Sequence, residues 1–104
     1  KPGGRLVGYV PFLVKFHPDP NDYFRYTEQG LTRLLLDSGF VDPGIKFIGM
    51  AMMTAAWSQI EYFLPRLLRW PITFFCFGSD RAILKIKPIF NNKYPLGYLF
   101  IAKK

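Results

Sequence analysis

One segment, residues 11–26, holds the densest group of side chains in this sequence that could do chemistry. It contains the only histidine of the chain, together with acidic, basic and phenolic groups: His17, Asp19, Asp22, Tyr23, Arg25 and Tyr26. A histidine here could act as a general base, because its pKa lies near neutral pH. Three prolines interrupt the segment, and its Asp and Asn residues favour turns. The segment is therefore predicted to be a loop.

Each of these residues also has a plainer interpretation. His17 could be a surface or capping residue, and Asp22 and Arg25, three residues apart, could pair to brace the loop. The aromatic residues around Phe24 could pack against the protein and not contact a ligand. One histidine and one cysteine cannot build a metal site at the usual ligand spacings, so we expect none.

The loop must be positioned by the elements around it. Residues 5–10 are almost all apolar after Arg5, a pattern typical of a strand covered on both faces. Thr27 is a good N-cap and Gly39 a good C-terminal stop, which predicts a helix over 28–38. A short strand is expected at 45–49. These three elements predict a parallel crossover unit of normal right-handed sense.

The stretch from residue 50 to residue 93 is rich in Met, Trp and Phe. Apolar residues recur there at helical spacing up to Pro65, which should end or kink the helix. We expect a second segment over 66–77 and then a third short helix or irregular return over 79–88. The longest uncharged apolar run is too short to span a bilayer. A closing strand is predicted at 97–102.

Composition limits the functional classes. The chain has 104 residues, enough for at most one domain, and 18% of them are aromatic, which argues for an ordered protein. A net charge of +7 suggests an anionic partner. The basic residues are dispersed, however, which argues against nucleic acid. Cys76 is the only cysteine, so no intrachain disulfide can form and we expect a reducing, cytoplasmic location.

The first residues form a Pro-Gly-Gly turn that runs straight into an apolar strand, with no initiator Met. We therefore expect that an N-terminal segment precedes Lys1. This turn is the first of several short motifs along the chain. In order, they are Lys1-Pro-Gly-Gly4, His17-Pro-Asp-Pro-Asn-Asp-Tyr-Phe-Arg-Tyr-Thr27, Gly30-Leu31, Leu34-Leu35, Ser38-Gly39-Phe40 and Tyr94-Pro-Leu-Gly-Tyr98 to Lys103. With these motifs the chain resembles the C-terminal third of class I S-adenosylmethionine-dependent methyltransferases, in particular the type 11-like group.

The resemblance implies an α/β fold, as a C-terminal fragment of a Rossmann-like methyltransferase sheet. In that family the strand order is 3-2-1-4-5-7-6, with strand 7 antiparallel. The chain would supply strands 5, 6 and 7 as a three-stranded mixed sheet with strand 7 in the middle, helix 28–38 and a helical insert 50–88. The outer edge of strand 5 would then be unpaired, which would make the isolated piece prone to association. We expect a single partial domain over residues 1–104, divided into a strand-helix-strand unit over 1–49, a lid-like insert over 50–93 and a closing strand over 94–104.

The resemblance also implies the cofactor and the partners. S-adenosylmethionine would bind in the complete enzyme, and its Gly-rich loop and acidic ribose ligand would lie upstream, so we expect no cofactor and no activity for this chain alone. The chain's partners would be the N-terminal half and a small or lipid-like acceptor. Ligands of open α/β sheets bind beyond the carboxyl ends of the strands. The acceptor residues there would be Phe12, His17, Asp22, Tyr23, Arg25 and Tyr26.

Topology places residues 50–94 on the same rim, where they could form a lid. A lid with Met, Trp and Phe beside Arg66 and Arg69 would suit an amphiphilic acceptor or shallow contact with a lipid surface. The same residues could instead be ordinary core. The alternative function is a non-enzymatic, basic, amphipathic module that binds a membrane surface and is therefore membrane-associated.

Overall fold

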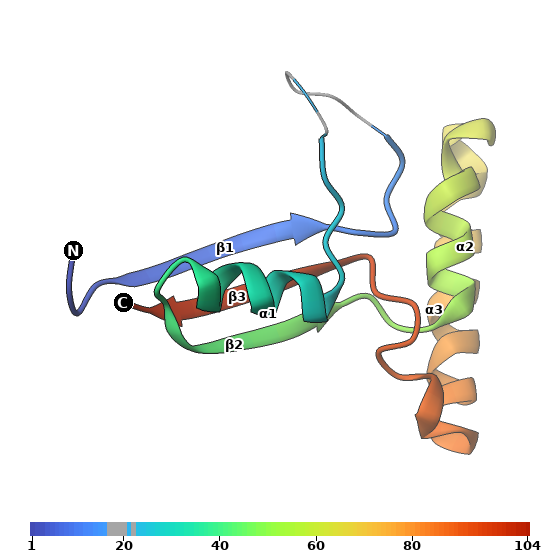
Figure 1. Ribbon diagram of the computed structural model, residues 1–104. Helices are drawn as coiled ribbons and strands as arrows, with labels where there is room; N and C mark the ends of the chain where they lie inside the picture. The colour runs from blue at the N-terminus through green and yellow to red at the C-terminus, as the bar shows by residue number, and fades with distance from the viewer. Residues whose placement is uncertain (17–20, 22) are drawn as a thin grey trace.

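The computed structural model describes residues 1–16, 21 and 23–104. It contains a three-stranded sheet, a helix packed on one face of the sheet and a pair of helices at its end (Figure 1). The elements are, in chain order, β1 (Arg5–Pro11), α1 (Glu28–Asp37), β2 (Val41–Ile48), α2 (Met52–Ile60), η1 (Glu61–Phe63), α3 (Arg66–Ile86), η2 (Pro88–Phe90) and β3 (Gly97–Lys103). The α/β composition predicted from the sequence is confirmed.

The last strand lies in the middle of the sheet. The order is β1–β3–β2, and β3 is antiparallel to both neighbours, with Arg5 opposite Lys103 and Ile45 opposite Phe100. The predicted central position of the closing strand is confirmed. The predicted mixed sheet is wrong for this chain, because every hydrogen-bonded pair among the described strands is antiparallel. β1 and β2 run in the same direction but do not pair, since β3 separates them.

Helix α1 begins and ends where the sequence predicts. The Thr27 hydroxyl accepts a hydrogen bond from the Gly30 N–H at 3.1 Å and so satisfies one of the free donors of the first turn. Beyond the end of the helix, Gly39 has a φ of +80°, the left-handed conformation that glycine adopts without strain. The helix covers Glu28–Asp37, within one residue of the predicted 28–38.

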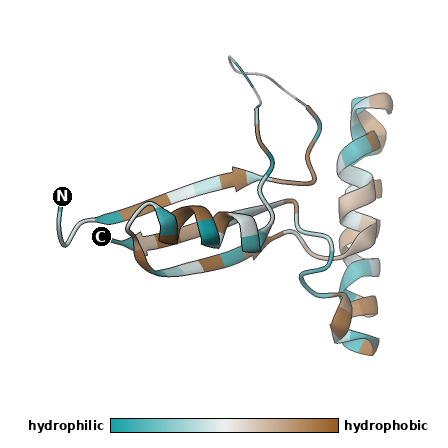
Figure 2. Cartoon of the chain, in the orientation of Figure 1, coloured by the Kyte–Doolittle hydropathy of each residue, from teal (hydrophilic) through white to brown (hydrophobic). Residues whose placement is uncertain are grey.

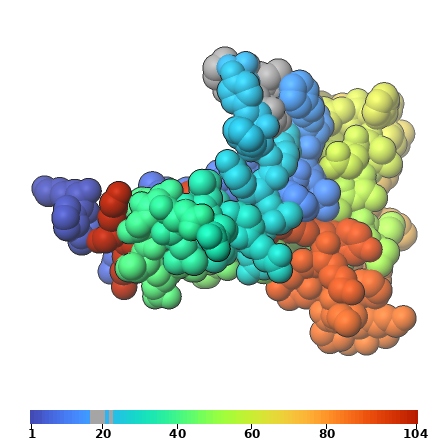
Figure 3. Space-filling model, in the orientation of Figure 1, coloured from blue at the N-terminus to red at the C-terminus, as the bar shows by residue number. Residues whose placement is uncertain are grey.

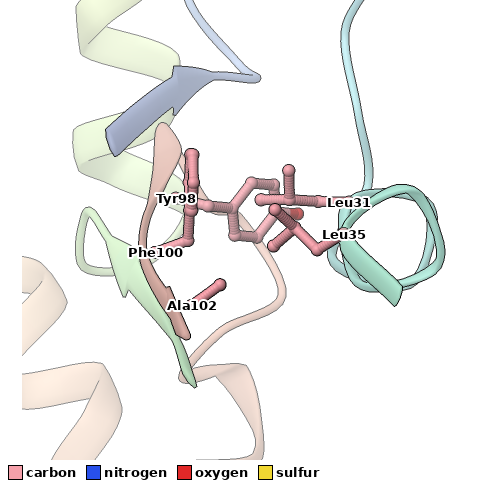
Figure 4. Close-up of a cluster of buried hydrophobic side chains, with 5 residues drawn as sticks. All are labelled: Leu31, Leu35, Tyr98, Phe100 and Ala102. Atoms are coloured by element: carbon pink, nitrogen blue, oxygen red, sulfur yellow. The ribbon is translucent and has the colours of Figure 1, made fainter. Parts of the chain in front are cut away.

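The core is small and lies between α1 and β3. Figure 4 shows Leu31 and Leu35 of α1 against alternate side chains of β3, of which Tyr98 and Phe100 are the largest. The Phe100 ring lies over Gly8 of β1, where a Cβ atom would come within 2.6 Å of it. An alanine at this position would therefore require the Phe100 ring to shift.

The opposite face of the sheet is open. Val7, Tyr9, Leu99 and Ile101 point to this side and all are exposed. Figure 2 shows apolar residues, coloured brown, along β1 and β2, with α1 lying in front of the sheet in this view. The prediction that β1 is covered on both faces is therefore wrong for this chain. Its sequence is apolar on both sides, but among the described residues only α1 returns across the sheet.

Helices α2 and α3 lie beyond the carboxyl ends of β1 and β2, as predicted for the insert (Figure 1). The two helices are antiparallel, and the Trp57 indole N–H donates to the Thr73 hydroxyl at 2.8 Å between them. The predicted division into a segment over 66–77 and a third short helix or irregular return over 79–88 is wrong, since α3 is continuous from Arg66 to Ile86. Pro71 lacks the N–H that would donate within the helix and its ring crowds the carbonyl of Leu67, but the helix continues through it.

The molecule is flat and angular, with the sheet projecting from the helical pair (Figure 3). It measures 49 × 37 × 19 Å, and its radius of gyration of 16.3 Å exceeds the roughly 13 Å typical of a compact domain of this length. Its accessible surface is 7733 Å², whereas a compact monomer of this mass exposes about 6,000 Å². The difference is as large as one side of an extensive protein interface.

Candidate functional site

The carboxyl ends of β1 and β2 meet the start of β3 at one rim of the sheet. The loop that follows β1 leaves from this rim, and α2 follows β2 there after a short turn (Figure 1). The first turn of α1 also lies at this rim. Four segments that are distant in the sequence therefore converge where ligands of open α/β sheets usually bind.

A hollow of about 430 Å³ opens at this rim, and we call it the rim pocket. Its apolar part is aromatic, with Phe12 and Phe47 each packed against Tyr98 at ring-centroid distances of 5.8 and 5.4 Å. Its polar part comes from the start of α1 and from the segment before β3: Thr27, Glu28, Gln29, Asn92 and Lys93, together with Pro95. Such a site suits a small molecule with an apolar body and a polar end.

Tyr98 is the buried ionisable group of the rim pocket. Burial raises the pKa of its phenol, and the Glu28 carboxylate acts in the same direction, although a hydrogen bond with the Glu28 backbone opposes it. The phenol therefore stays protonated at neutral pH and can donate a hydrogen bond. Neither Tyr98 nor Phe47 was predicted as a site residue from the sequence, because both resemble ordinary strand residues.

Of the predicted acceptor residues, Phe12 lines the rim pocket. Arg25 instead holds the loop together. Its guanidinium donates to the backbone carbonyl oxygens of Phe12, Val14 and Lys15 at 3.0, 3.1 and 3.4 Å. These hydrogen bonds fix the start of the loop beside the rim pocket. Arg25 therefore positions the loop and does not line the pocket itself.

The two tyrosines predicted as acceptor residues lie in different environments. Tyr23 is 77% exposed, and its ring packs against Phe24 at a centroid distance of 6.4 Å. Tyr26 is partly buried, stacks on Phe24 and packs against the core. Neither lines the rim pocket. His17 and Asp22, the candidate base and the candidate partner of Arg25, lie outside the described residues.

The helical pair carries a buried carboxylate that the sequence pattern did not predict. The backbone N–H groups of Ala51, Met53 and Thr54 donate to Asp80 of α3 at 3.1, 3.0 and 2.8 Å. Burial alone would raise the pKa of Asp80, but the hydrogen bonds from Thr54, Met53 and Ala51 outweigh it and hold the pKa below its ordinary value. Asp80 thus caps the first turn of α2, which lacks a side-chain cap of its own. An acidic residue within an apolar and basic stretch was the sequence signal that could have indicated this role of Asp80.

An apolar groove of about 330 Å³ runs along the contact of α2 and α3. Its lining comes from both helices: Met53, Ala56, Trp57, Ile60, Leu64, Ile72, Phe75 and Cys76. Burial raises the pKa of the Cys76 thiol, and the nearby charge of Asp80 adds to this effect. Because the thiolate is the nucleophile and burial disfavours it, we interpret Cys76 as a buried core residue and not as a nucleophile.

Among the described residues, no three His, Cys, Asp or Glu side chains come close enough to hold a metal ion. Within the same portion of the chain, no helix is long and apolar enough to cross a membrane. Comparison with protein-family models, with curated proteins and with solved structures gives no match for this chain.

Proposed function

We propose that this chain is the substrate-side portion of a Rossmann-like, S-adenosylmethionine-dependent methyltransferase acting on a small or lipid-like acceptor. The observation that carries the proposal is the strand order β1–β3–β2, with the reversed strand in the centre and α1 crossing one face between β1 and β2. The resemblance implies this arrangement for strands 5, 7 and 6 of that sheet. A three-stranded sheet with a meander order would not have supported it.

The exposed surfaces support a larger sheet. β1 has one edge that pairs with β3, and its other edge is free among the described strands. The open face beside it carries Val7 and Tyr9 with their side chains exposed. Unpaired edges and apolar sheet faces are normally covered. We assign the free edge of β1 to a parallel strand of the N-terminal half, which would make the complete sheet mixed.

The residues of this chain do not fit the cofactor. The connection from β1 to α1 contains no glycine up to Gly30, and the N-terminus of α2 is already occupied by the Asp80 carboxylate. Neither helix start can therefore hold an anionic or ribose group in the usual way. The N-terminal half would hold S-adenosylmethionine, which supplies an electrophilic methyl group when bound.

The rim pocket would bind the acceptor. Phe12, Phe47 and Tyr98 would contact its apolar part, while Gln29 and Lys93 would hold a polar end. Methyl transfer is a direct displacement that depends mainly on positioning and a dry site. A pocket without a nucleophile or a metal among its described residues is adequate for this reaction.

The first test is binding of S-adenosylmethionine to the 104-residue chain, measured by isothermal titration calorimetry. We expect no heat of binding, and submicromolar affinity would contradict the assignment of the cofactor site to another segment. The second test is the reading frame upstream of Lys1. It should encode a Gly-rich strand-to-helix turn roughly 100 residues earlier, from the size of an α/β domain. An upstream stop codon followed closely by Met would contradict the proposal.

If that segment is found, the complete protein is assayed for transfer of labelled methyl groups to amphiphilic acceptors. Lys93→Ala at the rim pocket should raise KM for the acceptor, whereas Lys104→Ala at the opposite end of the sheet should not. Equal effects of the two substitutions would remove the rim pocket from the proposal.

A further inference from the structure

Helix α3 presents large apolar side chains to the outside. Leu67, Trp70 and Phe74 are spaced by three and four residues and so share one face, which we call the apolar stripe. They are 86%, 68% and 69% exposed, and Phe63 in the turn before α3 is 87% exposed. Isolated exposed apolar residues are common, but a contiguous row of this size marks an interaction surface.

The apolar stripe is held rigidly. The opposite side of α3 packs on α2 through Thr73 and the buried Cys76, and Asp80 ties the two helices together by three hydrogen bonds. Within the stripe the rings of Trp70 and Phe74 lie side by side, with centroids 6.2 Å apart. The exposed side chains therefore belong to a fixed face, not to a frayed helix.

The charges around the apolar stripe are basic. Arg66 precedes it, Arg81 lies seven residues beyond Phe74 on the same helical row, and Lys85 lies four residues further. All three basic residues are exposed. Residues 61–93 contain six Lys and Arg and two acids, of which Asp80 is buried as the cap of α2 and Glu61 is partly buried. The surface near the stripe is therefore positive.

We propose that the apolar stripe docks on an anionic phospholipid surface. α3 would lie in the plane of the interface, with Trp70 and Phe74 at the boundary between headgroups and acyl chains. Arg66, Arg81 and Lys85 would then reach the phosphates. Aromatic residues favour this depth, and each nearby basic side chain strengthens binding to anionic lipid about fivefold.

A second copy of the chain fits this surface less well. Two stripes packed face to face would offer no acidic side chain to pair with Arg66, Arg81 and Lys85, because the only acidic residue of α3, Asp80, is buried. Like charges in such an interface disfavour pairing. A lipid surface supplies both the apolar layer and the opposite charge. This inference holds whether or not the chain belongs to a methyltransferase.

The test is co-sedimentation of the 104-residue chain with vesicles of phosphatidylcholine alone or mixed with phosphatidylserine. We expect binding to the anionic vesicles that weakens as salt is raised. The double substitution Trp70→Ser and Phe74→Ser should reduce it at least tenfold, from the apolar area withdrawn from lipid by roughly two aromatic side chains. The matched control is Leu36→Ser with Val41→Ser, which removes exposed apolar groups from α1 and β2.

Tryptophan emission gives a second readout. Trp70 is exposed and Trp57 is only 6% exposed, so a blue shift on addition of anionic vesicles reports insertion of Trp70. The variant Trp57→Phe isolates this signal, and circular dichroism checks that each variant remains folded. Arg81→Gln with Lys85→Gln should weaken binding to the anionic vesicles by more than about tenfold, at about fivefold for each charge.

Several results would overturn the inference. These are absence of binding to anionic vesicles, binding that persists in the Trp70/Phe74 variant, or Trp70 emission that does not shift. Concentration-dependent self-association that is abolished by the same variant, without vesicle binding, would instead make the stripe a contact between copies. If the chain did bind S-adenosylmethionine tightly, the proposed function would be contradicted but the vesicle experiment would be unaffected. The two proposals can therefore fail separately.

Discussion

Substitution of Asp80 by asparagine should destabilise the helical pair strongly. The side chain is fully buried, and its carboxylate accepts three backbone hydrogen bonds from the first turn of α2. An asparagine loses the charge and turns one acceptor into a donor that faces N–H groups. We expect a loss of about 2–4 kcal/mol, because charged hydrogen bonds contribute about 1.5–3 kcal/mol and a buried unpaired donor costs about 1–3 kcal/mol. This is a large fraction of the stability of roughly 5–15 kcal/mol that is typical of a domain.

The assay is urea denaturation followed by the emission of Trp57, which is buried in the same helical pair. The matched control is Asp37→Asn, which changes the same chemical group in an exposed pair with Arg33 at 2.9 Å. Exposed pairs of this kind contribute about 0.3–0.5 kcal/mol. If Asp80→Asn costs no more than Asp37→Asn, the carboxylate is not the group that joins the two helices.

The same residue predicts a dependence of stability on pH. The pKa of Asp80 is lower in the folded chain than in the unfolded chain. Between these two pKa values the unfolded state binds more protons, so stability rises with pH. The contribution should be complete above about pH 4–5, where an unfolded Asp is ionised, and should disappear as pH falls through the folded pKa. Asp80→Asn should lack this component of the slope.

Three further predictions concern α1, the core and the rim pocket. Thr27→Ala should lower the free energy of unfolding by about 1 kcal/mol in urea, because the Gly30 N–H loses its acceptor, whereas Thr27→Ser should preserve it. Gly8→Ala should cost about 1–3 kcal/mol in the same assay, because the new methyl group would meet the Phe100 ring, and an unchanged midpoint would show that the ring moves aside freely. In an alkaline titration followed by phenolate absorbance, Tyr98→Phe should remove a component that titrates above the ordinary tyrosine pKa range. Loss of an ordinary component instead would mean that the phenol is not buried.

Local structure was predicted best where local chemistry determines it. Thr27 and Gly39 define the ends of α1 by hydrogen bonding and by backbone conformation, and the structure confirms both. Because Asp42 and Gly44 favour a turn, the sequence predicts a strand that begins only at residue 45, which is too late. That strand begins at Val41 and contains an irregularity there, with Asp42 at a φ of 50°. Tertiary pairing with β3 overrides the local turn preference.

Only some residues of the candidate site could be predicted. The rim was located from the direction of β1, and Phe12 lies there as expected. Tyr98 and Phe47 were missed because strand periodicity shows that a residue faces the core but not which end of the core opens to solvent. The role of Arg25 depends on three carbonyl groups that its sequence neighbours do not reveal.

Caps, periodicity and turn residues act over a few residues, so they were enough to assign most helices and strands. Together with the resemblance, they also placed the closing strand between the other two. The bare face of β1 and the capping of α2 by Asp80, which lies 26–29 residues away in the sequence, depend on how distant segments fold together. The outward direction of Leu67, Trp70 and Phe74 depends on the same folding. An apolar pattern shows that a surface avoids water, but only the arrangement of the other elements shows whether the chain itself covers that surface.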